Sequence, residues 1–542
     1  MHEMDRRITV GAIMVLALIL PTAAPLAEDR PSARIYSLGG DLVSGIIPDL
    51  YTDLSINPAY AYFADRLTLN YGRRDVSGFD MAFPYLSGGS FSGSASRFLY
   101  GTNEVSLYGI RISGWRAALS AQWRLSQDES NVSRTELGTG GNEYISANGD
   151  YTSDDGNFGR IDLAAARSIG DRSVFGFRIQ GRGYYESYSR VRSQETESYM
   201  DGLYMEIFRK VTQHGADSRL IRQLCLDLQT GVARRNGNEP ASELVLQASV
   251  RSLDYHKQLY DLHITREYDA AHILDNYRYD KTIWSDKREG VLWIYGLSAR
   301  HAFRGGIRVY SGGSLSTASY DAEWIDSERY LDWSQYSGDK TSSGEFTGNG
   351  SLWEASYFLK GGKEFSLHET LDFTIGLYGG LQRMHAEEDP VIHYAQSLNG
   401  GDTIRIDQPS SLKHTGTRVN MYVPLSIEFR PSSYFSFFSG FTIYGKWRKD
   451  VTENPALSPF YYEEPHTASV PGGASRADAF GHAIVIPETS VTNWRRELYT
   501  GNIVTLGFSL HYRDRFFVDV FSNSEIIPYS LGSRMIDVRY VF

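Results

Sequence analysis

Apolar and polar residues alternate one by one along several stretches of this chain. In residues 419–429, every odd position from Val419 to Phe429 is apolar, whereas Asn420, Ser426 and Glu428 occupy even positions. Successive side chains of a β-strand point to opposite faces of its sheet, so this pattern predicts strands with one apolar and one polar face. The same alternation occurs in five further runs, at 115–125, 175–186, 224–229, 371–378 and 504–513.

The lengths of these runs indicate a membrane protein rather than a soluble sheet. Four of the six runs last 10 to 12 residues, whereas the strands of soluble proteins average about five or six. A tilted strand that crosses a bilayer needs about 9 to 11 residues, and each of its backbone groups must bond to a neighbouring strand. We therefore predict an all-β fold, a transmembrane antiparallel up-and-down β-barrel formed by residues 66–542.

Short and long connections alternate between the runs, as they do between the two ends of such a barrel. Short connections are expected at 113–114 and 513–515, and long polar ones at 126–157 and 384–416. Counting strands through this alternation gives about 18, an even number, with 16 and 14 as alternatives. Four of the expected strand starts fall in the middle of the chain, near residues 200, 219, 243 and 258.

The N-terminus has the order of a secretory signal peptide. Arg6 and Arg7 precede a 13-residue, mostly apolar run at 8–20, and a Pro/Ala-rich stretch ends at Ala27. The run is too short to span a bilayer as a helix, which needs about 20 residues, and it fits the apolar core of an export signal. We predict that residues 1–27 are removed and that the mature chain is exported.

The last strand, residues 535–542, ends the chain on an aromatic residue. Its even positions are all apolar and include Tyr540 and Phe542, whereas Asp537 and Arg539 lie on the other face. The segment resembles the closing strand of bacterial outer-membrane β-barrels. The resemblance implies a place in the outer membrane of a Gram-negative bacterium, contact with outer-membrane lipid, and recognition by the barrel assembly machinery through Tyr540 and Phe542.

Residues 28–65 precede the first strand and lack clean alternation. Their apolar side chains need burial, and the barrel mouth is the nearest place, so we expect a plug-like segment that enters the lumen. Asn57-Pro58-Ala59 resembles a turn in the N-terminal hatch of the long-chain fatty acid transporter family of outer-membrane proteins. The resemblance implies uptake of hydrophobic compounds. The candidate plug residues are Asp49, Asp53, Asn57 and Pro58.

Charge limits the partners of this chain and indicates the lining of its lumen. A net charge of -11 argues against binding to nucleic acid, whose phosphates demand a basic surface. By strand phase, a set of charged side chains faces inward, where they would either line an aqueous pore or pair to hold the wall and plug. These lumen-facing candidates are Arg116, Arg124, Arg178, Arg182, Asp227, Asp372, Glu428, Arg430, Asp519, Asp537 and Arg539.

No catalytic motif occurs in the sequence. It contains no Walker loop, no HExxH and no paired cysteines, because Cys225 is the single cysteine. We predict no enzyme activity, no cofactor and no metal site. The leading hypothesis is a porin-like channel for passive passage of small solutes. The alternatives are uptake of hydrophobic compounds, an outer-membrane hydrolase, and a non-conducting structural barrel.

Overall fold

The computed structural model describes most of the 542-residue chain. The signal peptide predicted at residues 1–27 lies outside the described residues, as do residues 28–31, so the cleavage after Ala27 stays a prediction. The described residues are 32–77, 86–87, 90–91, 99–138, 142–202, 205–236, 239–268, 274–332, 340–398, 404–409, 412–454, 461–463, 475–477, 483–485, 491–512, 515–525 and 534–542.

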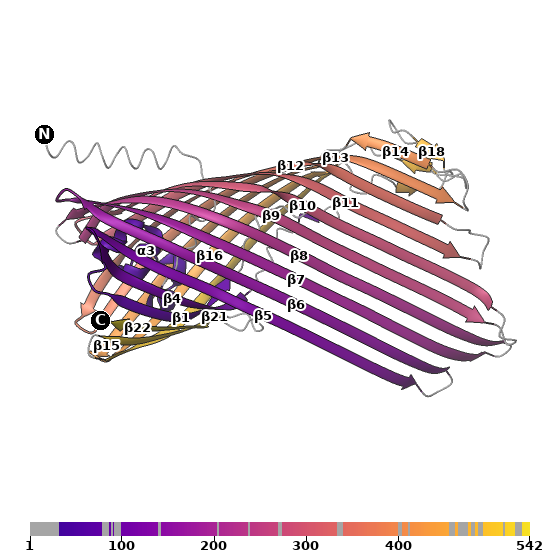
Figure 1. The fold of residues 1–542 in the computed structure, drawn as a ribbon, viewed down its shortest axis with the longest axis horizontal. Helices are drawn as coiled ribbons and strands as arrows, with labels where there is room; N and C mark the ends of the chain where they lie inside the picture. The colour runs from indigo at the N-terminus through magenta and orange to yellow at the C-terminus, as the bar shows by residue number, and fades with distance from the viewer. Residues whose placement is uncertain are drawn as a thin grey trace.

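An antiparallel sheet closes into a ring and forms a barrel (Figure 1). Its strands are β1 (Thr68–Ser77), β4 (Leu99–Ile112), β5 (Trp115–Gly138), β6 (Asn142–Ile169), β7 (Ser173–Gly202), β8 (Met205–Asn236), β9 (Glu239–Tyr268), β10 (Leu274–Ala302), β11 (Ile307–Asp332), β12 (Lys340–His368), β13 (Leu371–Leu398), β15 (Leu412–Ser432), β16 (Phe435–Asn454), β20 (Val491–Tyr512), β21 (Phe516–Glu525) and β22 (Arg534–Val541). The ring closes where β1 pairs with β22, from Thr68 opposite Val541 to Arg74 opposite Met535.

The sheet has 17 strands, and 16 of them make the ring. The remaining one, β14 (Ile404–Pro409), pairs with β13 beyond the end of β15 and so extends the row of β15. Short strands outside the ring form a two-stranded and a three-stranded sheet. They are β2 (Leu86–Ser87), β3 (Ser90–Phe91), β17 (Tyr461–Glu463), β18 (Ser475–Ala477) and β19 (Ala483–Val485).

The expected count of about 18 strands is wrong, and the alternative of 16 is confirmed. β8 begins near the start expected at 200 and runs unbroken through the one expected at 219, and β9 likewise includes both 243 and 258. The cause is strand length. β8 has 32 residues, about 110 Å at ~3.4 Å per residue, whereas the apolar band of a membrane barrel is about 25 Å tall.

Beyond that band, both faces of a strand meet water, so the alternation that marks a strand stops. The long connections expected at 126–157 and 384–416 are mostly strand for the same reason, because β5, β6, β13 and β15 extend deep into them. Figure 1 shows these strands extending far from the end of the barrel that holds the helices.

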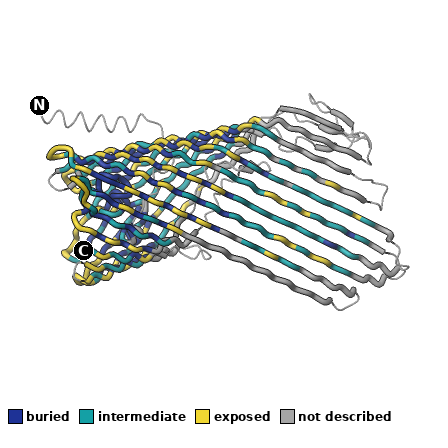
Figure 2. The backbone as a smooth tube through the Cα atoms, viewed as in Figure 1, coloured by how far each residue is buried: buried dark blue, intermediate teal, exposed yellow. Residues whose placement is uncertain are grey.

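Large apolar side chains face outward in a belt near the short connections. Leu224, Leu226 and Leu228 of β8 and Trp293 of β10 are each at least 45% exposed, and between them lie inward residues that are buried (Figure 2). Apolar surface in water is unfavourable by about 25 cal/mol per Å², so a continuous belt of this kind faces lipid. A closed antiparallel barrel with such a belt is the architecture of outer-membrane proteins.

The last strand belongs to this belt. Tyr540 and Phe542 point outward, with their ring centroids 4.9 Å apart, and the Phe542 amide donates to the Leu67 carbonyl at 3.0 Å. The chain therefore ends where the barrel closes. Recognition of these two aromatic residues by the assembly machinery stays a prediction.

Short helices lie inside the barrel at the end that carries the C-terminus (Figure 1). They are α2 (Ala33–Ser37), η1 (Gly40–Leu42), α3 (Leu50–Ile56) and η2 (Pro58–Phe63). Asp49 caps α3 by accepting from the Thr52 amide at 2.9 Å, and Asn57 caps η2 by accepting from the Ala59 amide at 2.9 Å. Pro58 fills the first position of η2, where its missing N–H has no consequence. Among the described residues, no helix has both the length and the apolar character needed to cross a membrane.

Candidate functional site

Residues 32–66, which we call the plug, pack against small side chains of the inner wall. Leu54, Ala59 and Tyr60 of the plug belong to a buried cluster that includes wall residues from several strands. Because most of these wall residues are alanine or valine, the plug approaches the strands closely, and its apolar side chains are buried. The wall members are Tyr108, Ala118, Ala164, Ala166, Val174 and Ala233.

The Asn57-Pro58-Ala59 turn lies directly on two glycines of the wall. Gly176 of β7 is opposite Gly231 of β8 in the ladder. A Cβ added to Gly176 would overlap the backbone of Pro58 and Ala59, and one added to Gly231 would overlap the side chain of Asn57. Glycine in a strand often marks the close approach of another backbone. A larger residue at either position would displace the turn.

The next inward-facing pair of β7 and β8 binds the C-terminus of α3. Arg178 is opposite Gln229. The Arg178 guanidinium donates to the Ser55 carbonyl at 2.6 Å and to the Leu54 carbonyl, and Gln229 Nε2 donates to the Ile56 carbonyl at 2.9 Å. The last carbonyls of a helix have no partner inside it, and a cation is favourable at that end of the helix dipole. The wall therefore completes the helix that it holds.

A buried polar network joins the plug to β9 and β10. Arg300 Nε donates to Glu243 Oε1 at 2.8 Å, and its terminal nitrogens bind the Asp53 carboxylate and the Tyr60 hydroxyl. Glu243 also accepts from Asn57 Nδ2 at 3.1 Å and from the Tyr60 hydroxyl at 2.8 Å. The side chains of Arg300, Asp53 and Glu243 are only 5–6% exposed. A buried charge is stable only when it is paired. Arg300 and Glu243 pair within the wall, whereas Asp53 pairs with Arg300 only while the plug is in place.

Two carboxylates share one guanidinium in this network. Burial raises the pKa of Asp53 to about 6; the charge of Arg300 opposes this rise, and the charge of Glu243 adds to it. The network is neutral when Asp53 is protonated and carries a net charge of -1 when both acids are ionised. The plug is therefore held more firmly at pH 5 than at pH 7.

The far side of the plug is bound by β11, β12, β15, β20 and β22. Arg34 of α2 pairs with Glu428 of β15 at 2.6 Å, and the Arg539 guanidinium of β22 lies over the Tyr51 ring, 4.5 Å from its centroid. Other wall residues donate to the plug: Arg308 to the Ile46 carbonyl at 3.1 Å, Lys360 to Ser44 Oγ at 3.1 Å, and Thr505 to the Ser37 carbonyl at 2.7 Å. Together with the β7–β10 contacts, these bridge the lumen from side to side.

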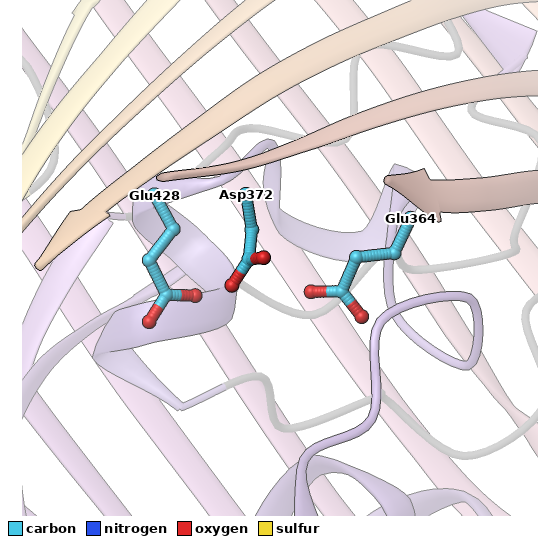
Figure 3. A group of neighbouring side chains, drawn as sticks. All are labelled: Glu364, Asp372 and Glu428. Carbon is cyan, nitrogen blue, oxygen red and sulfur yellow. The ribbon is translucent and has the colours of Figure 1, made fainter. Parts of the chain in front are cut away.

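Three carboxylates gather where this side of the plug meets the wall (Figure 3). Glu364 of β12, Asp372 of β13 and Glu428 of β15 project from neighbouring strands into one space, and each has an oxygen within 4.8 Å of the others. Such a donor set could hold a hard cation. Here Arg34 pairs with Glu428, and Arg430 pairs with Asp372. Positive charge is thus already supplied by protein, and we assign the cluster to plug attachment.

The lumen-facing candidates differ in their surroundings. Arg182 pairs with Asp227 at 2.9 Å, Arg539 pairs with Asp519 at 2.8 Å, and Arg116 binds the plug at Asp65 and the Tyr62 carbonyl. The side chain of Arg430 is 43% exposed, and that of Arg124 lies outside the described residues. The buried candidates are Arg178, Arg182, Asp227, Asp372, Glu428, Asp519 and Asp537.

The plug candidates Asp53, Asn57 and Pro58 are buried, and Asp49 is a helix cap. Glu243 and Arg300, to which the plug is bound, were not predicted from the sequence. Gly176 and Gly231 were not predicted either, although the sequence carries a signal for them. Both glycines have the inward phase of their strands, where a missing side chain indicates that another segment lies close.

No protein-family model matches this chain, and no curated protein matches it. Among solved structures, similar ones include a FadL homologue of Pseudomonas aeruginosa, with 10% identity, coverage of 96% of this chain and 99% of the other, and a TM-score of 0.29. The toluene transporter TbuX of Ralstonia pickettii has 11% identity, coverage of 95% and 99%, and a TM-score of 0.29. The CymD monoaromatic hydrocarbon channel has 10% identity, coverage of 94% and 97%, and a TM-score of 0.29.

Superpositions with a TM-score of 0.29 are too loose to transfer a substrate or a mechanism. The function is therefore inferred from the contacts of this chain alone.

Proposed function

We propose that this outer-membrane barrel is an uptake channel whose periplasmic end is closed by the plug and opens when the plug moves. The observation that carries the proposal is the bridging of the lumen by residues 32–66, which bind β7 to β10 on one side and β11, β12, β15, β20 and β22 on the other. A barrel of this size leaves a channel wide enough for solutes, so what fills it decides what passes.

Uptake of hydrophobic compounds is better supported than passive passage of small solutes. A passive pore needs a continuous aqueous path, and the plug interrupts that path at the level of Asp53 and Arg300, where the side chains are almost fully buried. The proposal for this chain rests on its own plug. If the protein is instead a non-conducting structural barrel, its lumen is closed in the same way but never opens.

Swelling of proteoliposomes separates these functions. Vesicles that contain the full-length protein are diluted into iso-osmotic arabinose, and swelling is followed by light scattering. We expect almost no swelling with the native protein and rapid swelling with Arg300→Met, because the lost guanidinium leaves the buried carboxylates of Asp53 and Glu243 without a cation. Breaking a buried pair in this way costs about 3–5 kcal/mol.

Arg190→Met is the matched control. Arg190 pairs with Asp150 at 2.5 Å on the outer extension, where both side chains are about one-third exposed, so its loss is expected to leave the vesicles closed. Swelling with the native protein would support the passive pore. Closed vesicles with Arg300→Met, in a protein that still shows the gel mobility of a folded barrel, would support the structural barrel.

A further inference from the structure

A row of aromatic side chains crosses the inner wall just outside the plug. Tyr378, Tyr422 and Tyr444 are direct partners across β13, β15 and β16. Lys360 of β12 continues the row, since it is opposite both Tyr378 and Tyr310 of β11. The row spans five strands, about 20 Å at ~4.8 Å per strand. Phe358 lies two residues further out on β12, and we call Tyr310, Phe358, Tyr378, Tyr422 and Tyr444 the aromatic row.

The rings of the aromatic row contact one another in sequence. Centroids are 4.9 Å apart for Tyr310 and Phe358, 6.4 Å for Phe358 and Tyr378, 5.3 Å for Tyr378 and Tyr422, and 5.9 Å for Tyr422 and Tyr444. Aromatic pairs at these separations are favourable. Tyr310 is buried at the plug, whereas the other four are half-buried, so the row leads from the plug into the lumen.

Two of the rings lie against the wall over glycines of neighbouring strands. A Cβ added to Gly501 would be 2.6 Å from Cζ of Tyr444, and one added to Gly312 would be 2.9 Å from Cζ of Phe358. These two rings therefore fill the space that a side chain at Gly501 or Gly312 would take. Successive ring planes of the row are inclined by 73°, 7°, 71° and 38°, so the row presents both faces and edges, and both can contact another aromatic group favourably.

Positive charge accompanies the row. Lys360 Nζ is 5.2 Å from the Tyr310 centroid, and Lys446 Nζ is 5.0 Å from the Tyr444 centroid. Arg418 of β15 and Arg448 of β16 are opposite each other, and Arg448 lies two residues beyond Lys446 on its strand. Lys360 also donates to the plug at Ser44. Among the described inward residues of β11 to β16 beyond the plug contacts, the other three cations meet two carboxylates, Glu354 and Asp450, and Asp450 pairs with Arg448.

We propose that the aromatic row is the solute-binding site of the channel and that it takes planar aromatic anions. The rings of the solute pack among Tyr378, Tyr422 and Tyr444, face to face with one ring and edge to face with the next. Its anionic group lies near Lys446 and Arg418. This inference deepens the proposed uptake function and rests on it. A neutral hydrocarbon would use the rings but not the excess of positive charge, and a carboxylate without a ring would use only the charge.

Isothermal titration of the detergent-purified full-length protein with 2-naphthoate tests this site. 2-Naphthol, which is neutral at pH 7, and cyclohexanecarboxylate, which lacks an aromatic ring, are the comparison ligands. We expect 2-naphthoate to bind more tightly than either. Tyr422→Leu should weaken its binding roughly threefold to tenfold, whereas Tyr422→Phe, which keeps the ring, should stay within about twofold of the native protein. Lys446→Met should weaken 2-naphthoate about tenfold and leave 2-naphthol unchanged.

Matched controls lie on the outside of the same barrel. Tyr295→Leu removes an outward tyrosine of β10 that is 50% exposed, and Lys287→Met removes an exposed lysine of the same strand. Both should bind 2-naphthoate like the native protein, and empty micelles correct for partition into detergent. Equal affinity in Tyr422→Leu and Tyr295→Leu, no binding of 2-naphthoate, or equal affinity for 2-naphthoate and 2-naphthol would each overturn the proposal.

The two proposals fail in different ways. If 2-naphthoate does not bind but Arg300→Met still opens the vesicles to arabinose, the channel stands and the assignment of the aromatic row is wrong. If 2-naphthoate binds the aromatic row and no variant opens the vesicles, the site stands as a binding site and the channel function is wrong.

Discussion

The Arg300 network and the aromatic row occupy adjacent parts of one inner wall, yet they are built differently. Arg300, Glu243 and Asp53 are almost fully buried, and each is bound to a partner. Tyr378, Tyr422 and Tyr444 are half-buried, and their rings contact one another. Charges that are buried and mutually paired fix a segment in place, whereas half-buried aromatic rings can pack against a planar solute. The comparison indicates that one part of the wall holds the plug and the other receives the solute.

The largest expected effect comes from breaking the Arg300 network. Arg300→Met should release α3 and η2 from the wall, since two buried carboxylates lose their only shared cation. With about 3–5 kcal/mol lost, hydrogen exchange of the amides in residues 50–60 should accelerate at least a hundredfold, as measured by mass spectrometry. Unchanged exchange in a folded barrel would mean that Arg300 does not hold the plug.

A smaller effect should follow from pH. The pKa of Asp53 is raised from 3.8 to about 6 by burial, so the seated plug holds a proton that the released plug loses between these values. Stability of the seated state is therefore fully present below about pH 4, falls as pH rises to 6, and is level above that. The whole difference is roughly 3 kcal/mol. After correction for the pH dependence of amide exchange in an unfolded chain, hydrogen exchange of residues 50–60 should accelerate between pH 4 and pH 6.

Asp53→Asn supplies the control for the pH effect. The amide can still accept from Arg300 but has no proton to lose, and it leaves Glu243 as the single carboxylate partner. The pH dependence between 4 and 6 should disappear in this variant. If it persists, another group titrates.

The smallest expected effect is that of a substitution in one region on the readout of the other region. Tyr422→Leu should weaken 2-naphthoate binding yet leave the exchange of residues 50–60 within about twofold of the native protein, because α3 and η2 are bound to β7–β10 and Tyr422 belongs to β15. Conversely, Asp53→Asn should not change the affinity for 2-naphthoate. A variant in one region that moved both readouts equally would show that binding and plug seating are not separate.

The sequence predicted the barrel because lipid demands an apolar residue at every second position, as in 419–429. The same rule could not count the strands in the middle of the chain. The outer parts of β8 and β9 meet water on both faces, so nothing in their pattern distinguishes strand from connection. Strand phase also could not identify partners. Arg300 and Glu243 meet Asp53 only because the ring closes around a segment more than 180 residues away in the chain.

Glycines gave a usable clue that phase alone did not. Gly176 and Gly231 lie on inward positions of long strands, and their pairing follows from the register of β7 and β8. That register, together with the Asn57-Pro58-Ala59 turn, would have placed the plug on this part of the wall. The aromatic row had no equivalent signal, because its members are spread over residues 310–444 and meet only through cross-strand register.

Ion current through single barrels in a planar bilayer tests the closed, plugged lumen most directly, with Gly176→Leu against Gly181→Leu. Gly176 lies under the Asn57-Pro58-Ala59 turn, whereas a Cβ on Gly181 of the same strand meets nothing within 4 Å. We predict small or no steps for the native protein and for Gly181→Leu, and large, long-lived steps for Gly176→Leu, whose side chain displaces the turn. Large steps in the native protein, or no change in Gly176→Leu, would mean that the plug does not close the lumen.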